Sequence, residues 1–250
     1  MSEQSNALRG GEFLIRETSA DAIFIPEEWT EEQLMMKQMT LDFVEQRIIP
    51  NLERIEQQED GLVPKLMEEA GELGLIGSSV PEELGGMGLD FKSTMLITEA
   101  IGGAHSFSVS FSAHTGIGTL PILYYGNDKQ KKQWIPGLAS GQLKGCYCLT
   151  EPSAGSDANN GKTTAKLTED GQHYLINGQK MWITNAGFAN LFTVFAKIDD
   201  DDKLTAFLIE ADSDGITLNP EEKKMGIKGS STRQVFFNDV KVPVENLLSE

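Results

Sequence analysis

The hydrophobic pattern changes its period near the middle of the chain, which restricts the folds that the chain can adopt. Before about residue 145, apolar residues recur three and four positions apart, as between Met36 and Ile48. After Cys146, short runs alternate between apolar and polar residues and are separated by turn residues. Helical spacing indicates amphipathic helices, and alternation indicates half-buried strands. The sequence therefore predicts an N-terminal extension over residues 1–28, an α-helical domain over 29–145 and a β-barrel or sandwich domain over 146–250.

Several helices are expected in the first domain. The first begins after Thr30, which forms a capping box with Gln33, and it ends near Pro50. His105 and His114 lie among small apolar residues, without a carboxylate nearby in the sequence, and are predicted to pack or form hydrogen bonds rather than bind a ligand. The other helices are expected in VPKLMEEAGELG, in FKSTMLITEAIGG, from about Ser108 to Tyr125, and in NDKQKKQWIPGLASG.

The second domain is expected to contain short strands joined by turns. The segment QHYLINGQKMWIT alternates around Asn177-Gly178, a pair that is typical of a two-residue hairpin turn. Asp199 to Asp202 form an acidic turn that lacks the spaced ligands of a calcium-binding loop. Further strands are predicted in LFTVFAKI, LTAFLIEA, GITLNP and RQVFFNDVKVP.

Charge and cysteine content exclude several classes of function. With 21 basic and 38 acidic residues the formal net charge is −17, which opposes binding to nucleic acid and to anionic lipid. A disulfide between Cys146 and Cys148 would strain a strand, and no further Cys or His pair completes a metal site. Reduced thiols, a polar N-terminus without a signal peptide and the lack of an apolar run of membrane-spanning length predict a cytoplasmic protein.

The loop TEPSAGSD, residues 150–157, follows the first expected strand at the junction of the two domains. Pro152 restricts the backbone, Gly155 permits conformations that other residues avoid, and such a turn can aim N–H groups at an anion or a ring. Spacing alone favours an ordinary connector over a ligand cradle. In MWIT, Trp182 and Thr184 are two apart and are expected on one strand face, as the wall of a planar ring or as ordinary core.

The motifs CYCLTEPSAGSD and KMWITNA resemble the paired signature of the acyl-CoA dehydrogenase family. The resemblance extends from Trp29 to Leu248 and includes PEELGGMGLD and KKMGIKGSSTRQVFFNDVKVPVENLL. It implies an α-helical N-terminal domain, a β-barrel-like middle domain and a C-terminal four-helix bundle. The bundle has no counterpart in these 250 residues.

The resemblance also implies FAD as the cofactor. It places Tyr147, Cys148, Leu149, Thr150 and the turn through Gly155 and Ser156 along the flavin, with Trp182, Ile183 and Thr184 as the second flavin-contacting segment. Ser156 is also expected near the acyl-CoA substrate, and Thr150 and Thr184 are the candidate donors to the reduced ring.

The implied reaction is the α,β-dehydrogenation of an acyl-CoA to a trans-2-enoyl-CoA in fatty acid β-oxidation, with long or very long chains favoured. No catalytic residue is assigned, since the family's general-base glutamate is expected beyond residue 250, and neither Glu151 nor Glu99 lies at its position. An electron-transferring flavoprotein is the expected acceptor, and a homodimer or homotetramer the expected assembly. Two alternatives stay open: a related acyl-CoA oxidase or nitroalkane-oxidase-like flavoenzyme, and a non-catalytic binding module.

Overall fold

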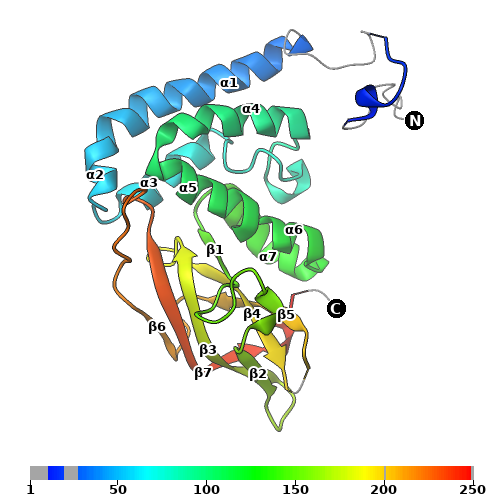
Figure 1. Ribbon diagram of the computed structural model, residues 1–250, viewed down its shortest axis with the longest axis vertical. Helices are drawn as coiled ribbons and strands as arrows, with labels where there is room; N and C mark the ends of the chain where they lie inside the picture. The colour runs from blue at the N-terminus through cyan, green and yellow to red at the C-terminus, as the bar shows by residue number, and fades with distance from the viewer. Residues whose placement is uncertain (1–10, 20–27, 200, 249–250) are drawn as a thin grey trace.

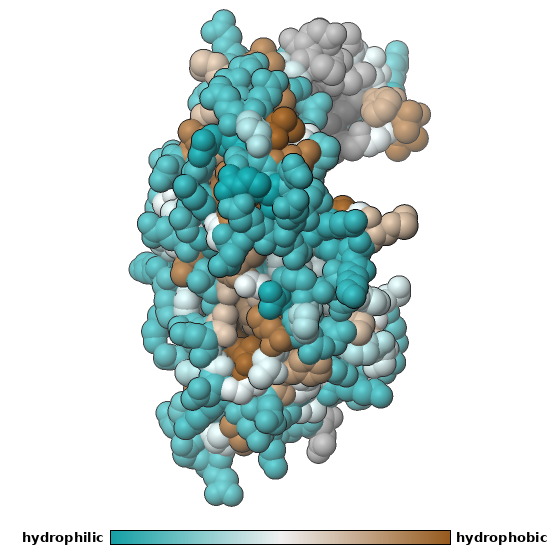
Figure 2. All heavy atoms as spheres, turned by 90° about the vertical axis from the view of Figure 1, so that its left-hand side faces the viewer, coloured by the Kyte–Doolittle hydropathy of each residue, from teal (hydrophilic) through white to brown (hydrophobic). Residues whose placement is uncertain are grey.

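The computed structural model describes residues 11–19, 28–199 and 201–248. Helices occupy the first half of the described chain and strands the second, and the two halves lie one above the other in Figure 1. The face drawn in Figure 2 is mostly hydrophilic, as expected for a strongly acidic chain. The helical half contains α1 (Glu31–Phe43), α2 (Leu52–Glu56), α3 (Leu62–Glu72), α4 (Phe91–Ile101), α5 (Ser106–Ala113), α6 (Leu120–Tyr125) and α7 (Asp128–Ala139).

The start of the first helix is as predicted, whereas the helical path does not end near Pro50. Thr30 and Gln33 form the expected capping box at the beginning of α1. The helical path continues through a π-type turn (Val44–Ile48) and a 3-10 turn (Ile49–Asn51) into α2. Pro50 does not stop it, because proline is tolerated in the first turn of a new helical segment, where no N–H donor is required.

The β half is a single seven-stranded sheet that curls on itself, in agreement with the predicted fold class (Figure 1). The strand order is β1-β4-β2-β3-β7-β6, and β5 pairs with the other edge of β4. β1 and β2 run parallel to β4, and the remaining pairs are antiparallel. The strands are β1 (Gly145–Cys148), β2 (Thr164–Leu167), β3 (His173–Thr184), β4 (Leu191–Ile198), β5 (Leu204–Glu210), β6 (Ile216–Leu218) and β7 (Thr232–Pro243).

The predicted hairpin at Asn177-Gly178 is wrong, because both residues lie inside the continuous strand β3. The turn before β3 instead spans residues 168–172, with Gly171 at φ +66°. Asn177 exchanges hydrogen bonds with Asp239 where the register of β3 and β7 shifts. Gly178 lies so close to Thr163 that a Cβ atom would come within 2.5 Å of its hydroxyl oxygen. Asn177 thus lies at a β-bulge, and Gly178 allows the backbone to approach Thr163 closely.

The two halves share part of their hydrophobic core. One buried cluster joins Ile122, Ile135 and Leu138 of the helices to Leu191 and Leu208 of the sheet. The imidazole of His114, completely buried, adds a polar link: its Nε2 lies 2.9 Å from the Leu138 carbonyl, and its Nδ1 accepts from the Gly145 N–H at 3.0 Å. The structural role predicted for His114 is confirmed. These contacts set the position of β1 and of the loop that follows it.

Candidate functional site

The loop TEPSAGSD leaves β1 and turns back at once. Glu151 and Ala154 exchange both backbone hydrogen bonds, at 3.0 and 3.1 Å, which closes a tight turn around Pro152 and Ser153. The side chains of Glu151 and Ala154 are buried, whereas residues 155–157 are exposed. The loop therefore presents glycine, hydroxyl and backbone groups to the surface from a fixed base.

The structure brings this loop and the MWIT segment together. The Met181 N–H donates to the Thr150 carbonyl at 2.8 Å, so the two motifs that are distant in sequence lie side by side. Thr150 and Thr184 are both half-buried. Neither hydroxyl forms a hydrogen bond with any other residue that the structure describes. Two hydroxyl donors are thus available for a group from outside the chain, one in the loop and one three residues beyond Met181.

Trp182 adopts an unusual backbone conformation and is exposed. Its φ is +59°, and 61% of its surface is accessible, although it lies within β3, two residues before the end of that strand. The cause is a bulge, since Lys180 pairs with Val235 but Ile183 pairs with Arg233. A positive φ in a bulky residue costs about 1–3 kcal/mol and is retained mainly at functional sites. The bulge interrupts simple alternation, but Ile183 still faces the core while Trp182 and Thr184 do not.

Two of the predicted residues, Cys148 and Ile183, can contribute only through their main chain. The side chains of Cys148 and Ile183 belong to the core of the sheet. Both cysteines are free thiols, with sulfur atoms 3.8 Å apart. The conformational freedom that glycine permits is not used at Gly155, because its φ is not in the left-handed region and a Cβ there would meet nothing within 4 Å. The chain itself therefore does not demand glycine at position 155.

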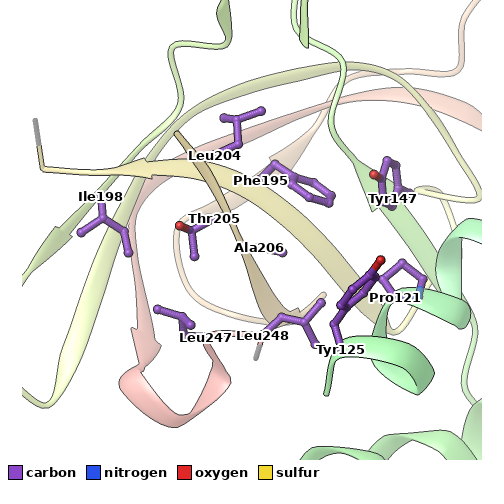
Figure 3. A pocket seen from close by; sticks show the side chains of 10 residues that line it. All are labelled: Pro121, Tyr125, Tyr147, Phe195, Ile198, Leu204, Thr205, Ala206, Leu247 and Leu248. Atoms are coloured by element: carbon purple, nitrogen blue, oxygen red, sulfur yellow. The ribbon is translucent and has the colours of Figure 1, made fainter. Parts of the chain in front are cut away.

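A hollow of ≈ 590 Å³ lies where α6, β1, β4, β5 and the last described residues meet (Figure 3). Tyr147 lines it, and its ring packs against that of Phe195 with centroids 4.8 Å apart. Burial raises the pKa of the Tyr147 phenol, which stays protonated at neutral pH. Of the predicted site residues, Tyr147 lines this hollow, whereas Thr150 and Trp182 do not. The remaining lining is mostly apolar: Pro121, Tyr125, Ile198, Leu204, Thr205, Ala206, Leu247 and Leu248.

An ion pair that sequence reasoning missed lies beneath the two segments. Lys180 and Glu151 have side chains that are 0% and 4% exposed, with Nζ and Oε1 2.7 Å apart. Burial by itself raises the pKa of Glu151, but the Lys162 N–H, the Lys180 ammonium and the Thr163 hydroxyl together hold it below its ordinary value. The residues are 29 positions apart, and no spacing rule connects a loop glutamate to a strand lysine.

Metal binding and membrane insertion find no support in the described part of the chain. Among residues 11–19, 28–199 and 201–248, no group of three or more His, Cys, Asp or Glu side chains is arranged to hold a metal ion. No helix within these ranges combines the length and the apolar character needed to cross a bilayer.

Comparison with known proteins identifies the family. Residues 30–142 match the N-terminal domain of acyl-CoA dehydrogenases, and residues 146–240 match their middle domain. A probable acyl-CoA dehydrogenase of Bacillus subtilis is 50% identical over 242 residues, which are 97% of this chain and 41% of that protein. The human mitochondrial very long-chain specific acyl-CoA dehydrogenase is 46% identical over 189 residues, 72% of this chain and 29% of that protein.

A solved structure shows the same fold. The crystal structure of an acyl-CoA dehydrogenase complexed with FAD from Bacillus anthracis has a TM-score of 0.94 and 49% identity, covering 98% of this chain and 42% of that one. The chain belongs to the acyl-CoA dehydrogenase family and carries its N-terminal and middle domains. It spans about two-fifths of the Bacillus relatives' length.

Proposed function

We propose that this chain holds FAD against residues 149–156 and 182–184 and forms part of a flavin-dependent acyl-CoA dehydrogenase. The observation that carries the proposal is the hydrogen bond from Met181 to Thr150, which joins the loop to the exposed Trp182 segment. When bound, FAD supplies a ring system that takes up two electrons and a proton from the thioester substrate.

The residues present fit such a group. A planar ring needs a flat apolar surface beside polar donors, and the exposed indole of Trp182 and the unpaired hydroxyls of Thr150 and Thr184 provide both. Fixed donors stabilise negative charge as it develops, because they need no reorganisation during the reaction. Thr150 and Thr184 take this role, Trp182 excludes water from one side, and the exposed Ser156 contacts the acyl-CoA.

The α-proton is removed by a base outside these 250 residues. Glu151 lies in the loop that is proposed to contact the flavin, but its carboxylate is buried and accepts four hydrogen bonds, so it cannot reach a substrate. Glu99 lies on α4 and pairs with Lys37. A carboxylate from a further domain, as the family resemblance implies, completes the reaction.

Substrate, acceptor, assembly and location follow the same reasoning. Similarity to a very long-chain specific relative supports a long acyl chain. An electron-transferring flavoprotein would serve as the electron acceptor, and the complete protein forms a homodimer or homotetramer. The free, buried thiols of Cys146 and Cys148 agree with a cytoplasmic location.

Flavin absorbance tests this proposal. Residues 1–250, purified with FAD, should be yellow and should not bleach at an enzymatic rate when a long-chain acyl-CoA is added without oxygen. The complete reading frame that contains this chain should bleach within one turnover. Bleaching of the 250-residue chain at the rate of the complete protein would show that the base lies within it. Failure of both proteins to take up FAD would contradict the proposed cofactor.

Replacing Gly155 by alanine should separate cofactor binding from folding. The new methyl group meets nothing within 4 Å in the chain, so the melting temperature should stay unchanged. It would occupy space beside the loop backbone, and FAD affinity should fall about tenfold. Fluorescence titration with FAD measures this. The control is Gly102→Ala, at the end of α4, where a Cβ is equally free. Unchanged affinity in Gly155→Ala would remove the loop from the binding surface.

A further inference from the structure

We propose that Glu151 and Lys180 are positioning residues, whose buried ion pair holds the loop after β1 against β3 and thereby sets the relation between the two flavin-facing segments. This inference rests on the proposed function, because it assigns the pair a role in binding the cofactor. Neither side chain is accessible to a ligand, so both act through the residues that they hold in place.

The carboxylate of Glu151 joins the start of the loop to residues 162 and 163 at its end and to Lys180 on β3. Its Oε1 accepts from Lys180 Nζ at 2.7 Å and from the Thr163 hydroxyl and N–H at 2.6 and 3.0 Å. Its Oε2 accepts from the Lys162 N–H at 2.6 Å. Residues 162 and 163 are the last residues of the loop that contains Glu151, directly before β2. One side chain thus closes the base of the loop and ties that base to β3.

Lys180 connects the same loop from the side of the strand. Its ammonium also donates to the Leu149 carbonyl at 3.3 Å, and the adjacent Met181 N–H donates to the Thr150 carbonyl at 2.8 Å. Lys180 is the last residue of β3 in regular pairing before the bulge that exposes Trp182. The ion pair therefore acts directly at both flavin-facing segments.

The far end of the MWIT segment has an anchor of its own. Asn185 is completely buried and has a φ of +68°. Its side-chain amide donates to the Ser110 carbonyl on α5, and its N–H donates to the Ser231 carbonyl, both at 2.9 Å. Residues 182–184 are thus held between two buried polar anchors, which explains how an exposed tryptophan keeps a strained conformation.

Stability alone does not account for such a pair. Removing two charges from water costs about as much as their attraction returns, and a well-packed apolar pair often stabilises a protein equally well. An apolar pair has no directional bonds, however, and could not fix the loop relative to the strand. Directional contacts beneath a site are what keep its surface residues in place.

The test uses the 250-residue chain and three variants: Lys180→Met, Glu151→Gln, and both together. The readouts are the melting temperature, the FAD dissociation constant, and hydrogen exchange at the amides of Lys162, Thr163 and Met181 without FAD. Each single variant leaves one member of the pair buried without its charged partner and should melt at a lower temperature. The double variant should recover the melting temperature, yet bind FAD at least about tenfold more weakly and exchange these amides faster.

The matched control is Lys129→Met, which breaks an exposed ion pair with Glu245 and should change none of the three readouts. If the double variant matches the wild type in FAD affinity and exchange, the pair is only structural and the proposal is wrong. If the double variant does not fold, Glu151→Asp replaces it, because this variant keeps both charges but withdraws the carboxylate by one methylene. Weaker FAD binding and faster amide exchange in Glu151→Asp would then support the proposal, and wild-type values of both would contradict it. If wild type does not bind FAD, the proposed function fails for this chain, while exchange still decides whether the pair holds the loop.

Discussion

Replacing Gly71 by alanine is expected to remove about 3 kcal/mol or more of the free energy of unfolding. Gly71 lies in α3 where the helix meets the loop between α7 and β1. A Cβ at this position would lie 2.0 Å from the Ser140 carbonyl oxygen and 2.5 Å from its carbon. Both are backbone atoms, so no side-chain rotation relieves the overlap. Because the whole stability of a domain is only about 5–15 kcal/mol, the effect should be visible in a single urea titration.

The control for this substitution is Gly116→Ala. Gly116 also lies in a helical turn, but a Cβ there would meet nothing within 4 Å. Alanine has the better helix propensity, so this variant should be as stable as the wild type or slightly more so. Equal midpoints for Gly71→Ala and Gly116→Ala would contradict the close packing of α3 on the loop before β1.

Acid should destabilise the chain through His114, by about 3 kcal/mol between pH 6.5 and 4. Burial, with a smaller contribution from the nearby Lys144 ammonium, lowers the pKa of His114 to about 4 from its ordinary 6.5. The folded protein therefore keeps the imidazole neutral where the unfolded chain binds a proton. This part of the stability is present above pH 6.5 and is lost as the pH falls toward 4.

Urea unfolding of wild type and His114→Asn at pH 7 and pH 4.5 measures this contribution. Asparagine keeps an acceptor for the Gly145 N–H but does not titrate. The variant should be less stable at pH 7 and lose less on acidification, and the carboxylates common to both proteins cancel in the comparison. The exposed His105, changed to asparagine in the same way, controls for an imidazole lost from the surface. Equal losses in wild type and His114→Asn would show that His114 does not couple folding to protonation.

Both predictions concern the junction that carries the candidate site. Gly71 lies against Ser140 and His114 bonds to Gly145, so the two residues contact both ends of the segment that leads into β1 and the loop after it. The helical half thus determines where the loop begins, and the ion pair of Glu151 and Lys180 determines where it lies on the sheet. Variants at the junction should affect folding first, whereas variants of the ion pair should also affect the cofactor.

Much of the architecture follows from local patterns in the sequence. The capping box at Thr30 depends on residues three positions apart, and LFTVFAKI is a short, mostly apolar run followed by turn residues, as a largely buried strand requires. The hairpin predicted at Asn177-Gly178 is wrong because the same two residues suit either a hairpin turn or a bulge. The choice between them was made by Thr163 and Asp239, which are distant in sequence from the pair.

By itself, the sequence determined the order of the elements, the division into a helical and a sheet half, and the two motifs of the candidate site, since each is written in neighbouring residues. Only the tertiary structure decided that Trp182 is exposed with a positive φ, that Gly155 is free of steric constraint, and that Glu151 pairs with Lys180. The reason is physical: a strand bulge and a buried ion pair depend on which partners the folded sheet brings together, and no local spacing specifies those partners.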